Sequence, residues 1–318
     1  MDRLRILLCG LVITLGSCSA PEPPLRVGLL LWPPYELTVM AQQEGWYSED
    51  SIRILEYQSP IQLSRAFRSG QVDVALTTSH ISLSLAQDGI DHRIIYVVDH
   101  SQGGDALMAR PGVESLEGLA GRTVGVEPSP LGMYVLGRLL DRADLDRSDI
   151  SVMPLDIPQQ RSAYVSGRVD AVLTYEPVRS RLRAEGAREL FNSQEIPHEI
   201  IDVVIARKAV VDARPEHLRT LLSGMDRALS YLREDPDSAL PLMASRALMD
   251  TGDFRLALEG AHLLDMEENA QWLRGDPSQL TDALRVQMEY MQAMGMLSGP
   301  VDVQALVDAR FLGQGGTE

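Results

Sequence analysis

The chain of 318 residues contains two cysteines and one lysine, and both cysteines, Cys9 and Cys18, lie near its N-terminus. Beyond Cys18 it therefore has no disulfide, no thiol nucleophile and no cysteine metal site. The sequence also lacks a Ser-His-Asp order, an HExxH zinc motif and a phosphate-binding P-loop. These absences argue against the enzyme classes that such motifs mark. We expect no metal, no cofactor and no catalytic residue.

Positive charge is also in short supply. The 45 acidic residues outnumber the 29 lysines and arginines, which leaves a formal net charge of −16. A chain this acidic is a poor partner for nucleic acid or for an anionic membrane surface. No segment after residue 20 approaches the roughly 20 apolar residues of a membrane-spanning helix, so we expect a soluble body. We expect that body to be a monomer.

The N-terminus has the features of an export signal. Two arginines precede an apolar run over residues 6–15, which is too short to anchor the chain in a bilayer. The tetrapeptide LGSC at residues 15–18 resembles a bacterial lipoprotein processing box. It predicts a signal peptide over residues 1–17, lipidation of Cys18 and a tethering linker over residues 18–24. The alternative is an ordinary secretory signal with an incidental cysteine.

The predicted lipid would hold the mature protein in the periplasm, anchored to the cell envelope. The proline-rich linker is expected to be extended and stiff. Ser19 follows the cysteine, at the position where an aspartate is associated with retention in the inner membrane of Gram-negative bacteria. The lack of that aspartate favours the outer membrane if the host has one.

One nonapeptide occurs twice, as SGQVDVALT at residues 69–77 and as SGRVDAVLT at residues 166–174. In each copy a helical stretch precedes the glycine, which can adopt at little cost the left-handed conformation that ends a helix. The apolar run after each aspartate predicts a short buried strand that ends on a threonine. Ligands bind at the carboxyl ends of strands in open α/β sheets, so we expect Thr77 and Thr174 to face each other across one cleft.

Strands and helices alternate along most of the chain, which predicts an α/β fold with parallel sheets and helices on both faces. The predicted strands cover residues 26–31, 51–57, 72–76, 93–98, 106–109, 123–126, 150–154, 171–174 and 199–207. From Lys208 to the end the pattern is helical, interrupted by prolines.

Two segments, ALMAR at residues 106–110 and EIIDVVIAR at residues 199–207, end on the same dipeptide. We interpret them as paired crossings between two lobes. This predicts lobe I over residues 25–108 and 206–318, and lobe II over residues 109–205. A cleft between the lobes would hold the ligand.

Five segments carry a resemblance to a known family. They are VGLLLWPPYELTVMAQQEGWYSED (27–50), SGQVDVALTTS (69–79), DHSQGGDALMAR (99–110), ESLEGLAGRTVGVEPSPLGMYVL (114–136) and SGRVDAVLTYEP (166–177). In order and spacing they resemble the periplasmic solute-binding proteins of ABC importers, in the group that serves nitrate, sulfonate, taurine and thiamine-precursor uptake. The resemblance implies a two-lobed type II periplasmic binding protein fold with a helical C-terminal region. It also implies the transmembrane subunits of an ABC permease as partner.

The candidate ligand contacts of lobe I follow two of its strands. Trp32 and Tyr35 come after the first strand, where an aromatic pair suits stacking on a ligand. Trp32 could instead pack under the neighbouring helix. Thr77, Thr78 and Ser79 end the third strand and begin a helix, where hydroxyls and free N–H groups suit an oxygen-rich group. Simple N-capping is the alternative for these hydroxyls.

The candidate contacts of lobe II follow its strands in the same way. They are Asp105, Glu127, Ser129, Tyr134, Tyr175 and Glu176. Relatives tend to hold an anion after the TVGV strand, but here Pro130 removes one N–H donor and Glu127 adds negative charge. Gly104 stands where the group commonly has an alanine. Asp105 could instead brace the turn, and Glu176 could bond the hinge backbone.

Acidic residues gather near the predicted cleft, so a cationic or hydrogen-bond-donating ligand has equal standing with an anion. The resemblance implies a lipoprotein that captures a small organic solute, such as an amine, a pyrimidine or a sulfonate, for an ABC importer. The alternatives are a carrier of a hydrophobic ligand between membranes and a lyase on the same fold. The fungal thiamine-pyrimidine synthase shares the fold, but its cysteine-rich motif has no counterpart in this chain.

Overall fold

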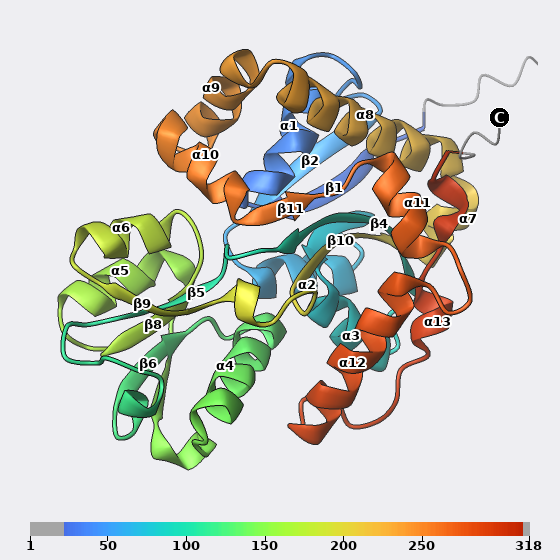
Figure 1. The fold of residues 1–318 in the computed structure, drawn as a ribbon. Helices are drawn as coiled ribbons and strands as arrows, with labels where there is room; N and C mark the ends of the chain where they lie inside the picture. The colour runs from blue at the N-terminus through green and yellow to red at the C-terminus, as the bar shows by residue number, and fades with distance from the viewer. Residues whose placement is uncertain (1–21, 314–318) are drawn as a thin grey trace, which may run out of the picture.

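Two α/β bodies, each built around one β-sheet, make up the computed structural model of the protein, which describes residues 22–313 (Figure 1). We call the body around the first sheet lobe I and the other lobe II. The predicted signal peptide, the lipidation site at Cys18 and most of the predicted linker lie outside the described residues. Within residues 22–313, no helix has both the length and the apolar character needed to cross a membrane.

The sheet of lobe I has six strands in the order β11-β4-β10-β3-β1-β2. They are β1 (Leu25–Leu30), β2 (Ile52–Tyr57), β3 (Val74–Thr78), β4 (His92–Ser101), β10 (Ile201–Arg207) and β11 (Ala261–Leu263). β1 pairs in parallel with β2 and β3, whereas β10 runs antiparallel to β3 and β4. The segments between the first four strands form η1 (Pro33–Tyr35), α1 (Glu36–Gln43), α2 (Pro60–Arg68) and α3 (Ser79–Gln87).

The sheet of lobe II has five strands in the order β7-β6-β8-β5-β9. They are β5 (Ala106–Ala109), β6 (Thr123–Val126), β7 (Ser151–Pro154), β8 (Ala171–Thr174) and β9 (Arg188–Asn192). The helical segments of this lobe are η2 (Glu117–Leu119), α4 (Pro130–Ala143), η3 (Arg147–Asp149), α5 (Ile157–Val165), α6 (Val178–Ala184) and η4 (Ser193–Glu195). β6 is parallel to β7 and β8, and β5 is antiparallel to β8 and β9.

Both sheets share one plan, because β2-β1-β3-β10-β4 and β7-β6-β8-β5-β9 have the same pattern of strand directions. The prediction of parallel sheets is therefore wrong for β10 and β5, which run against their neighbours, and the edge strand β11 also pairs antiparallel with β4. Each of β10 and β5 lies next to a crossing, so it enters its sheet from the other lobe and in the opposite direction.

The two crossings differ from those expected. β5 and β10, which carry the shared Ala-Arg dipeptide, lie in different sheets and do not pair with each other. The chain leaves the first sheet after Ser101 and enters the second at Ala106, and it returns between Asn192 and Ile201. Both crossings thus come a few residues before the lobe limits that the sequence suggested.

The repeated nonapeptide ends a helix and begins a central strand in each lobe. Gly70 and Gly167 have φ angles of 73° and 77°, as expected for glycines that end α2 and α5. A residue with a Cβ atom would be strained in this conformation. β3 and β8, which follow the two glycines, hold the same place in the two sheets.

The aspartate of each repeat fastens the strand to its neighbour. The backbone N–H of Arg26, in β1, donates to Oδ2 of Asp73 at 2.9 Å. The backbone N–H of Thr123, in β6, donates to Oδ2 of Asp170 at the same distance, 2.9 Å. An aspartate at this position therefore satisfies a strand N–H in both lobes, which explains why the repeat retains it.

The shared Ala-Arg dipeptide has an equivalent explanation. The backbone N–H groups of Arg207 and Arg110 donate to the carbonyls of the two repeat aspartates, at 3.0 and 2.9 Å. The guanidinium of Arg207 lies over the ring of Phe67, and that of Arg110 lies over the ring of Tyr164. Each dipeptide thus lies at the end of the antiparallel strand that borders a repeat.

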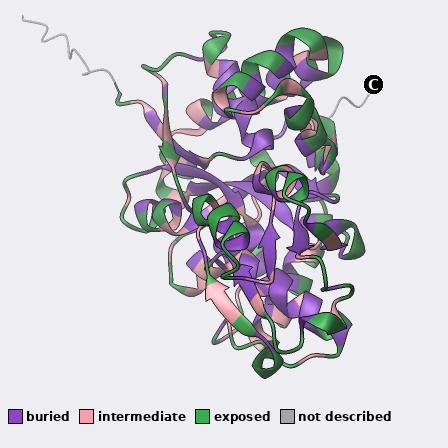
Figure 2. Cartoon of the chain, turned by 90° about the vertical axis from the view of Figure 1, so that its left-hand side faces the viewer, coloured by how far each residue is buried: buried purple, intermediate pink, exposed green. Residues whose placement is uncertain are grey.

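The C-terminal region is helical, as predicted, except for the short strand β11. Its helices are α7 (Lys208–Ala213), α8 (Pro215–Glu234), α9 (Pro236–Arg246), α10 (Thr251–Glu259), α11 (Met266–Leu273), α12 (Gln279–Ala293) and α13 (Val303–Leu306), followed by η5 (Ala309–Phe311). They surround the sheet of lobe I (Figure 1). The strands are mostly buried and the outer helix faces are exposed (Figure 2).

Candidate functional site

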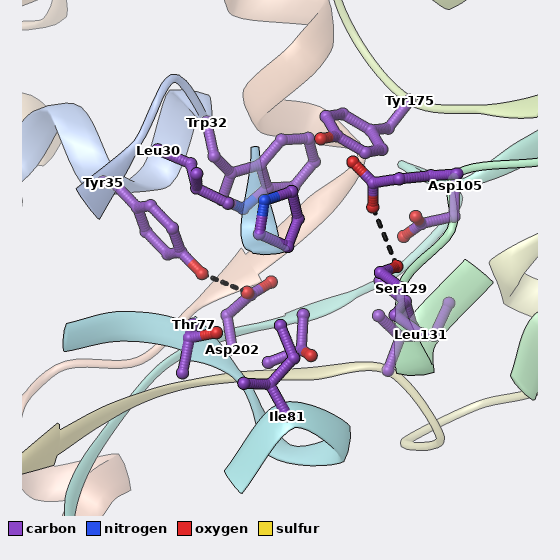
Figure 3. A pocket seen from close by; sticks show the side chains of 14 residues that line it. Leu30, Trp32, Tyr35, Thr77, Ile81, Asp105, Ser129, Leu131, Tyr175 and Asp202 are labelled. Carbon is purple, nitrogen blue, oxygen red and sulfur yellow. Dashed lines mark hydrogen bonds between the residues drawn. The ribbon is translucent and has the colours of Figure 1, made fainter. Parts of the chain in front are cut away.

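A pocket lies where the carboxyl ends of strands from both lobes meet. The space in it that no atom fills is about 480 Å³, counted out to its open mouth. Its lining consists of Leu30, Trp32, Tyr35, Pro60, Thr77, Thr78, Ile81, Asp105, Glu127, Ser129, Leu131, Tyr175, Ile200 and Asp202. Figure 3 shows Tyr35, Thr77 and Asp202 on one side and Asp105, Ser129 and Tyr175 on the other.

On the lobe I side, two aromatic residues contact buried carboxyl groups. Trp32 follows β1, and its Nε1 donates to Oδ2 of Asp99 at 3.4 Å. The hydroxyl of Tyr35, at the end of η1, donates to Oδ1 of Asp202 (Figure 3). Asp99 and Asp202 are partners in the register of the antiparallel strands β4 and β10. The two aromatic side chains are therefore held by carboxyls of the central strands beneath them.

On the lobe II side, Ser129 links the pocket to the start of α4. Its hydroxyl donates to Oε2 of Glu127 at 2.9 Å and accepts the N–H of Gly132 at 3.1 Å. Ser129 is thus both the N-cap of α4 and a partner of the pocket carboxyl. The ring of Tyr175 meets that of Trp32 edge to face, with centroids 5.4 Å apart and planes at 83°. This aromatic contact joins the two lobes at the pocket.

The carboxyl groups of the pocket lie in a poorly solvated place. Burial raises the pKa of Asp105 to about 6 and the pKa values of Glu127 and Asp202 to about 7. Burial, together with the charge of Asp202, raises the pKa of Asp99 well above its usual range. No arginine, lysine or histidine belongs to the part of the lining that the structure describes. The electrostatic character of the pocket is therefore acidic.

Several polar atoms at the pocket have no hydrogen-bond partner within residues 22–313. They are Oγ1 of Thr77, Oγ1 of Thr78, Oδ1 of Asp99 and Oε1 of Glu127. Buried polar atoms in folded proteins are usually paired, and each unpaired one costs about 1–3 kcal/mol. Thr77, Thr78 and Glu127 line the pocket, so two hydroxyls and one carboxyl oxygen are free to bond a ligand that supplies donors.

Eight of the eleven predicted contacts line this pocket: Trp32, Tyr35, Thr77, Thr78, Asp105, Glu127, Ser129 and Tyr175. That they bind a ligand stays a prediction. The structure brings most of them together because they end or follow strands at their carboxyl ends, as the sheet rule requires, whereas Asp105 lies on the first crossing directly before β5. Thr174, the second repeat threonine, borders a smaller neighbouring pocket that shares Asp105, Glu127 and Tyr175.

Three predicted contacts lie outside the lining, and each has another partner. The hydroxyl of Ser79, the first residue of α3, donates to Oε1 of Gln287 at 2.8 Å. The hydroxyl of Tyr134 donates to Oε2 of Glu199 at 2.7 Å, because a position one turn into α4 faces lobe I rather than the pocket. Its ring packs on that of His80, with centroids 4.3 Å apart.

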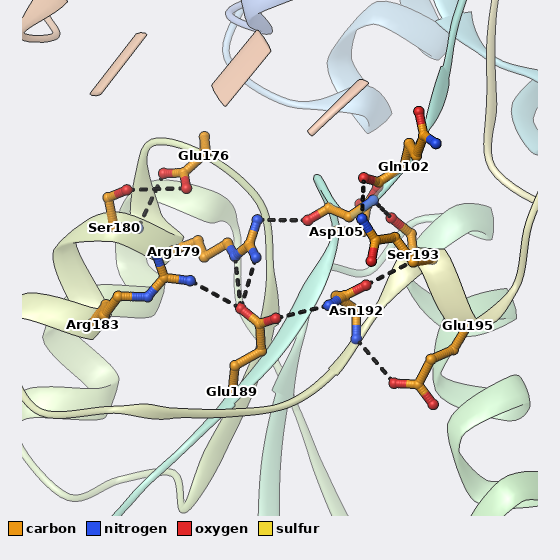
Figure 4. A network of polar contacts seen from close by, with 12 residues as sticks. Gln102, Asp105, Glu176, Arg179, Ser180, Arg183, Glu189, Asn192, Ser193 and Glu195 are labelled. Atoms are coloured by element: carbon orange, nitrogen blue, oxygen red, sulfur yellow. Dashed lines mark hydrogen bonds and ion pairs between the residues drawn. The ribbon is translucent and has the colours of Figure 1, made fainter. Parts of the chain in front are cut away.

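Glu176 is the third. Its carboxylate accepts the backbone N–H and the hydroxyl of Ser180, both at 3.0 Å, and so stabilises the start of α6 (Figure 4). Nearby, Arg179 pairs with Glu189 at 2.7 Å and donates to the carbonyl of Gly103 on the first crossing. Glu176 belongs to this network beside the crossings rather than to the pocket.

The sequence analysis did not predict Asp99 and Asp202 as residues of the site. Both lie inside strands, whereas the prediction considered the residues that follow strands. A signal was present: each is the one charged residue of an apolar run, IIYVVD for Asp99 and IIDVVIA for Asp202. A carboxyl group in a buried strand needs a partner, and a functional site is one place to find it.

Comparison with known proteins places the chain in a family. Residues 33–239 match the family described as "NMT1/THI5 like". The chain belongs to this family. It is 25% identical to the riboflavin-binding protein RibY of Chloroflexus aurantiacus over 98% of this chain and 99% of that protein. This confirms the family resemblance read from the five segments.

Solved structures confirm the fold of this NMT1/THI5-like protein. The alkanesulfonate-binding protein SsuA of Xanthomonas axonopodis pv. citri, bound to MOPS, has a TM-score of 0.77 at 18% identity, covering 92% of this chain and 100% of that chain. The desulfurization enzyme DSZB has a TM-score of 0.67, also at 18% identity, covering 92% and 98%. The predicted periplasmic binding protein fold is therefore correct, and this fold serves an enzyme as well as binding proteins.

The pocket of this family member offers acceptors rather than ligands for a metal. Across residues 22–313, no three His, Cys, Asp or Glu side chains are arranged to hold a metal ion. The pocket instead combines an aromatic pair, two free hydroxyls and several carboxyl groups. Such a lining can stack on a flat group and accept hydrogen bonds from it.

Proposed function

We propose that the protein is a solute-binding protein of an ABC importer and that it holds a small organic solute rich in hydrogen-bond donors or positive charge. The observation that carries the ligand class is the pocket lining, which has three carboxyl groups and, in its described part, no basic residue. Carboxylates accept hydrogen bonds and repel anions. A sulfonate would meet Asp105, Glu127 and Asp202 without a counter-charge.

Riboflavin is a second candidate, because the relative RibY aligns along nearly the whole chain and is named for that ligand. The Trp32 and Tyr175 pair would stack on a flat ring system, and the carboxyls would accept its N–H and O–H donors. A neutral donor-rich ligand of this kind fits the same lining chemistry as an amine or a pyrimidine.

Delivery to the permease and the lipid anchor complete the proposal. Both lobes meet at the pocket, so the surface around its mouth would dock onto the transmembrane subunits.

Lipidation of Cys18 would hold the monomeric protein to the envelope. Cys18→Ala is expected to move the protein from the membrane fraction to the soluble periplasmic fraction, as measured by immunoblot. Unchanged fractionation would contradict the anchor.

The first experiment identifies the ligand that the protein retains. Native mass spectrometry of protein purified without denaturation is expected to show a mass above that of the mature chain. A second spectrum after denaturation gives the mass of the released compound. Recovery of an unaltered compound after long incubation supports binding rather than catalysis, whereas conversion of it would support the enzymatic alternative.

The second experiment compares ligands that share one aromatic ring and differ in the charge of its substituent. Isothermal titration compares benzamidinium, neutral benzamide and benzenesulfonate, with riboflavin as a separate ligand. We expect the cation or the donor-rich riboflavin to bind, and binding of benzenesulfonate alone would contradict the proposal. Trp32→Ala should weaken binding by roughly tenfold, since an aromatic contact contributes about 1 kcal/mol beyond buried area. Trp46→Ala is the matched control, because Trp46 packs against Tyr231 and is not among the lining residues.

A further inference from the structure

The two carboxyl groups beneath the aromatic pair belong to residues that lie opposite each other on neighbouring strands. Asp99 and Asp202 are register partners on the antiparallel strands β4 and β10, which places their side chains next to each other on one face of the sheet. Two carboxylates are both acceptors, so a hydrogen bond between them requires a proton on one of them. Two neighbouring buried carboxylates also repel each other, so we expect the pair to hold one proton when Asp202 is charged.

The remaining contacts show which acid carries that proton. Asp202 accepts the hydroxyl of Tyr35, which favours its charged form. Asp99 is 0% exposed, receives only the long bond from Trp32 at 3.4 Å, and its Oδ1 has no partner within the described chain. Asp99 is thus the poorer place for a charge and the better place for the proton. Only Asp202 lines the pocket.

No positive charge on the described pocket lining can balance these acids. The titratable groups that face the pair are Tyr35 from η1, Asp105 from the first crossing, and Glu127 and Tyr175 from lobe II. All are acids or phenols. A buried negative charge without a counter-charge costs several kcal/mol. The proton reduces that cost when no cation is bound.

We propose that Asp202 is the subsite for a positively charged nitrogen of the solute, and that arrival of this nitrogen expels the proton held by Asp99 into solvent. This rests on the proposed binding function and narrows the ligand to a cation. The step conserves protons and charge. The carboxylic acid of Asp99 becomes a carboxylate, its proton enters water, and the positive charge of the ligand replaces that of the proton. Asp99 does not line the pocket and acts through Asp202, so it is a positioning residue.

Proton release makes the affinity for a cation depend on pH. Where one proton is released, the association constant rises about tenfold per pH unit below the pKa of the pair. Titration of benzamidinium in phosphate and in Tris, which differ in ionisation enthalpy, counts the protons released. We expect wild-type protein near pH 8, where Asp202 is charged, to release about one proton more than Asp99→Asn, because asparagine cannot hold that proton.

The variants separate the two roles. Asp99→Asn should retain binding with a flatter pH profile, whereas Asp202→Asn should lose roughly tenfold or more in affinity for benzamidinium. Asp212→Asn is the control, since Asp212 lies exposed on α7. Infrared spectra of ligand-free protein test the proton without any ligand. The carbonyl band of a protonated acid should be present at pH 8 in wild type, where Asp202 and Glu127 are largely charged, and reduced in Asp99→Asn.

Three results would overturn the inference. They are equal affinity for benzamidinium and benzamide, a proton count that Asp99→Asn leaves unchanged, and equal infrared bands in the two proteins. Tight binding of riboflavin without proton release would also reject it while upholding the binding function. If native mass spectrometry finds no retained compound and none of the ring probes or riboflavin binds, the proposed function itself fails.

Discussion

At Gly104 the first crossing passes so close to a neighbouring turn that a side chain has no room. A Cβ atom there would lie 2.8 Å from the carbonyl oxygen of Gly260 and 3.3 Å from Cη2 of Trp32. The alanine that the group commonly has at this position would therefore push against backbone and against a pocket aromatic. A glycine is needed at position 104 because the turn before β11 packs tightly against the first crossing.

Gly104→Ala should lower the free energy of unfolding by about 1–3 kcal/mol, the usual cost of overpacking. It should also weaken ligand binding, because Trp32 would have to move. Urea unfolding and titration measure the two effects. Gly118→Ala serves as the control, since the nearest atom to its Cβ would be a Val113 side-chain carbon at 3.7 Å. Equal stability of Gly104→Ala and wild type would show that the Gly260 turn yields easily.

At the scale of elements, the repeat aspartates give a matched pair of sites. Asp73 accepts both the backbone N–H and the guanidinium of Arg26, while Asp170 accepts the backbone N–H of Thr123 and lies 3.6 Å from a guanidinium nitrogen of Arg122. Asp73→Ala should cost about 2–3 kcal/mol of unfolding free energy, and Asp170→Ala somewhat less, because each leaves a strand N–H unpaired.

Urea unfolding of the two variants measures these costs. Asp91→Ala is the control: its ion pair with Arg93 involves an aspartate whose side chain is 68% exposed, and such pairs contribute little. A loss in Asp91→Ala as large as in Asp73→Ala would contradict the structural role of the repeat.

Element order was predictable from the sequence because apolar runs and glycines recur with a clear period. The strand Thr123–Val126 and the strand Ala171–Thr174 have the predicted bounds. The direction of β5 and β10 was not, since an apolar run carries no information on the lobe or the direction in which it pairs. The short β9 and β11 lack such a run and depend on their tertiary neighbours.

The same limits apply to the candidate site. Residues at or just after the ends of strands, such as Thr77 and Trp32, were predictable because strand ends converge at one edge of a sheet. Tyr134 was placed wrongly in the pocket lining because helix rotation relative to the other lobe decides its direction. Asp202 was not predicted because a residue inside a strand lines a pocket only where the segments that cover the sheet leave a gap over it. The sequence of the strand does not show where that gap lies.

At the scale of the molecule, lobe II contacts lobe I at more places than the pocket. The hydroxyl of Tyr290 in α12 donates to Asp141 of α4 at 2.6 Å, and the ring of His80 packs on that of Tyr134. These contacts hold the two lobes together beside the pocket, where Asp105, Glu127 and Asp202 are buried. The stability of the closed molecule should therefore depend on their protonation.

The folded-state pKa values of Asp105, Glu127 and Asp202 are raised to about 6, 7 and 7, so the native state holds more protons than the unfolded chain above pH 4. The stability that these protons contribute is present below the ordinary carboxyl pKa and is lost as the pH rises through the folded-state values. The melting temperature of ligand-free protein should thus fall between about pH 5 and pH 8.

Glu127→Gln keeps the uncharged form at every pH and should flatten this profile, raising stability at pH 8 by about 2–3 kcal/mol relative to wild type. Thermal unfolding at constant ionic strength measures it, with Glu114→Gln as the exposed control on the same lobe. A melting temperature that rises with pH across this range would mean that the pocket carboxyls are well solvated, and that the lobes stand apart when no solute is bound.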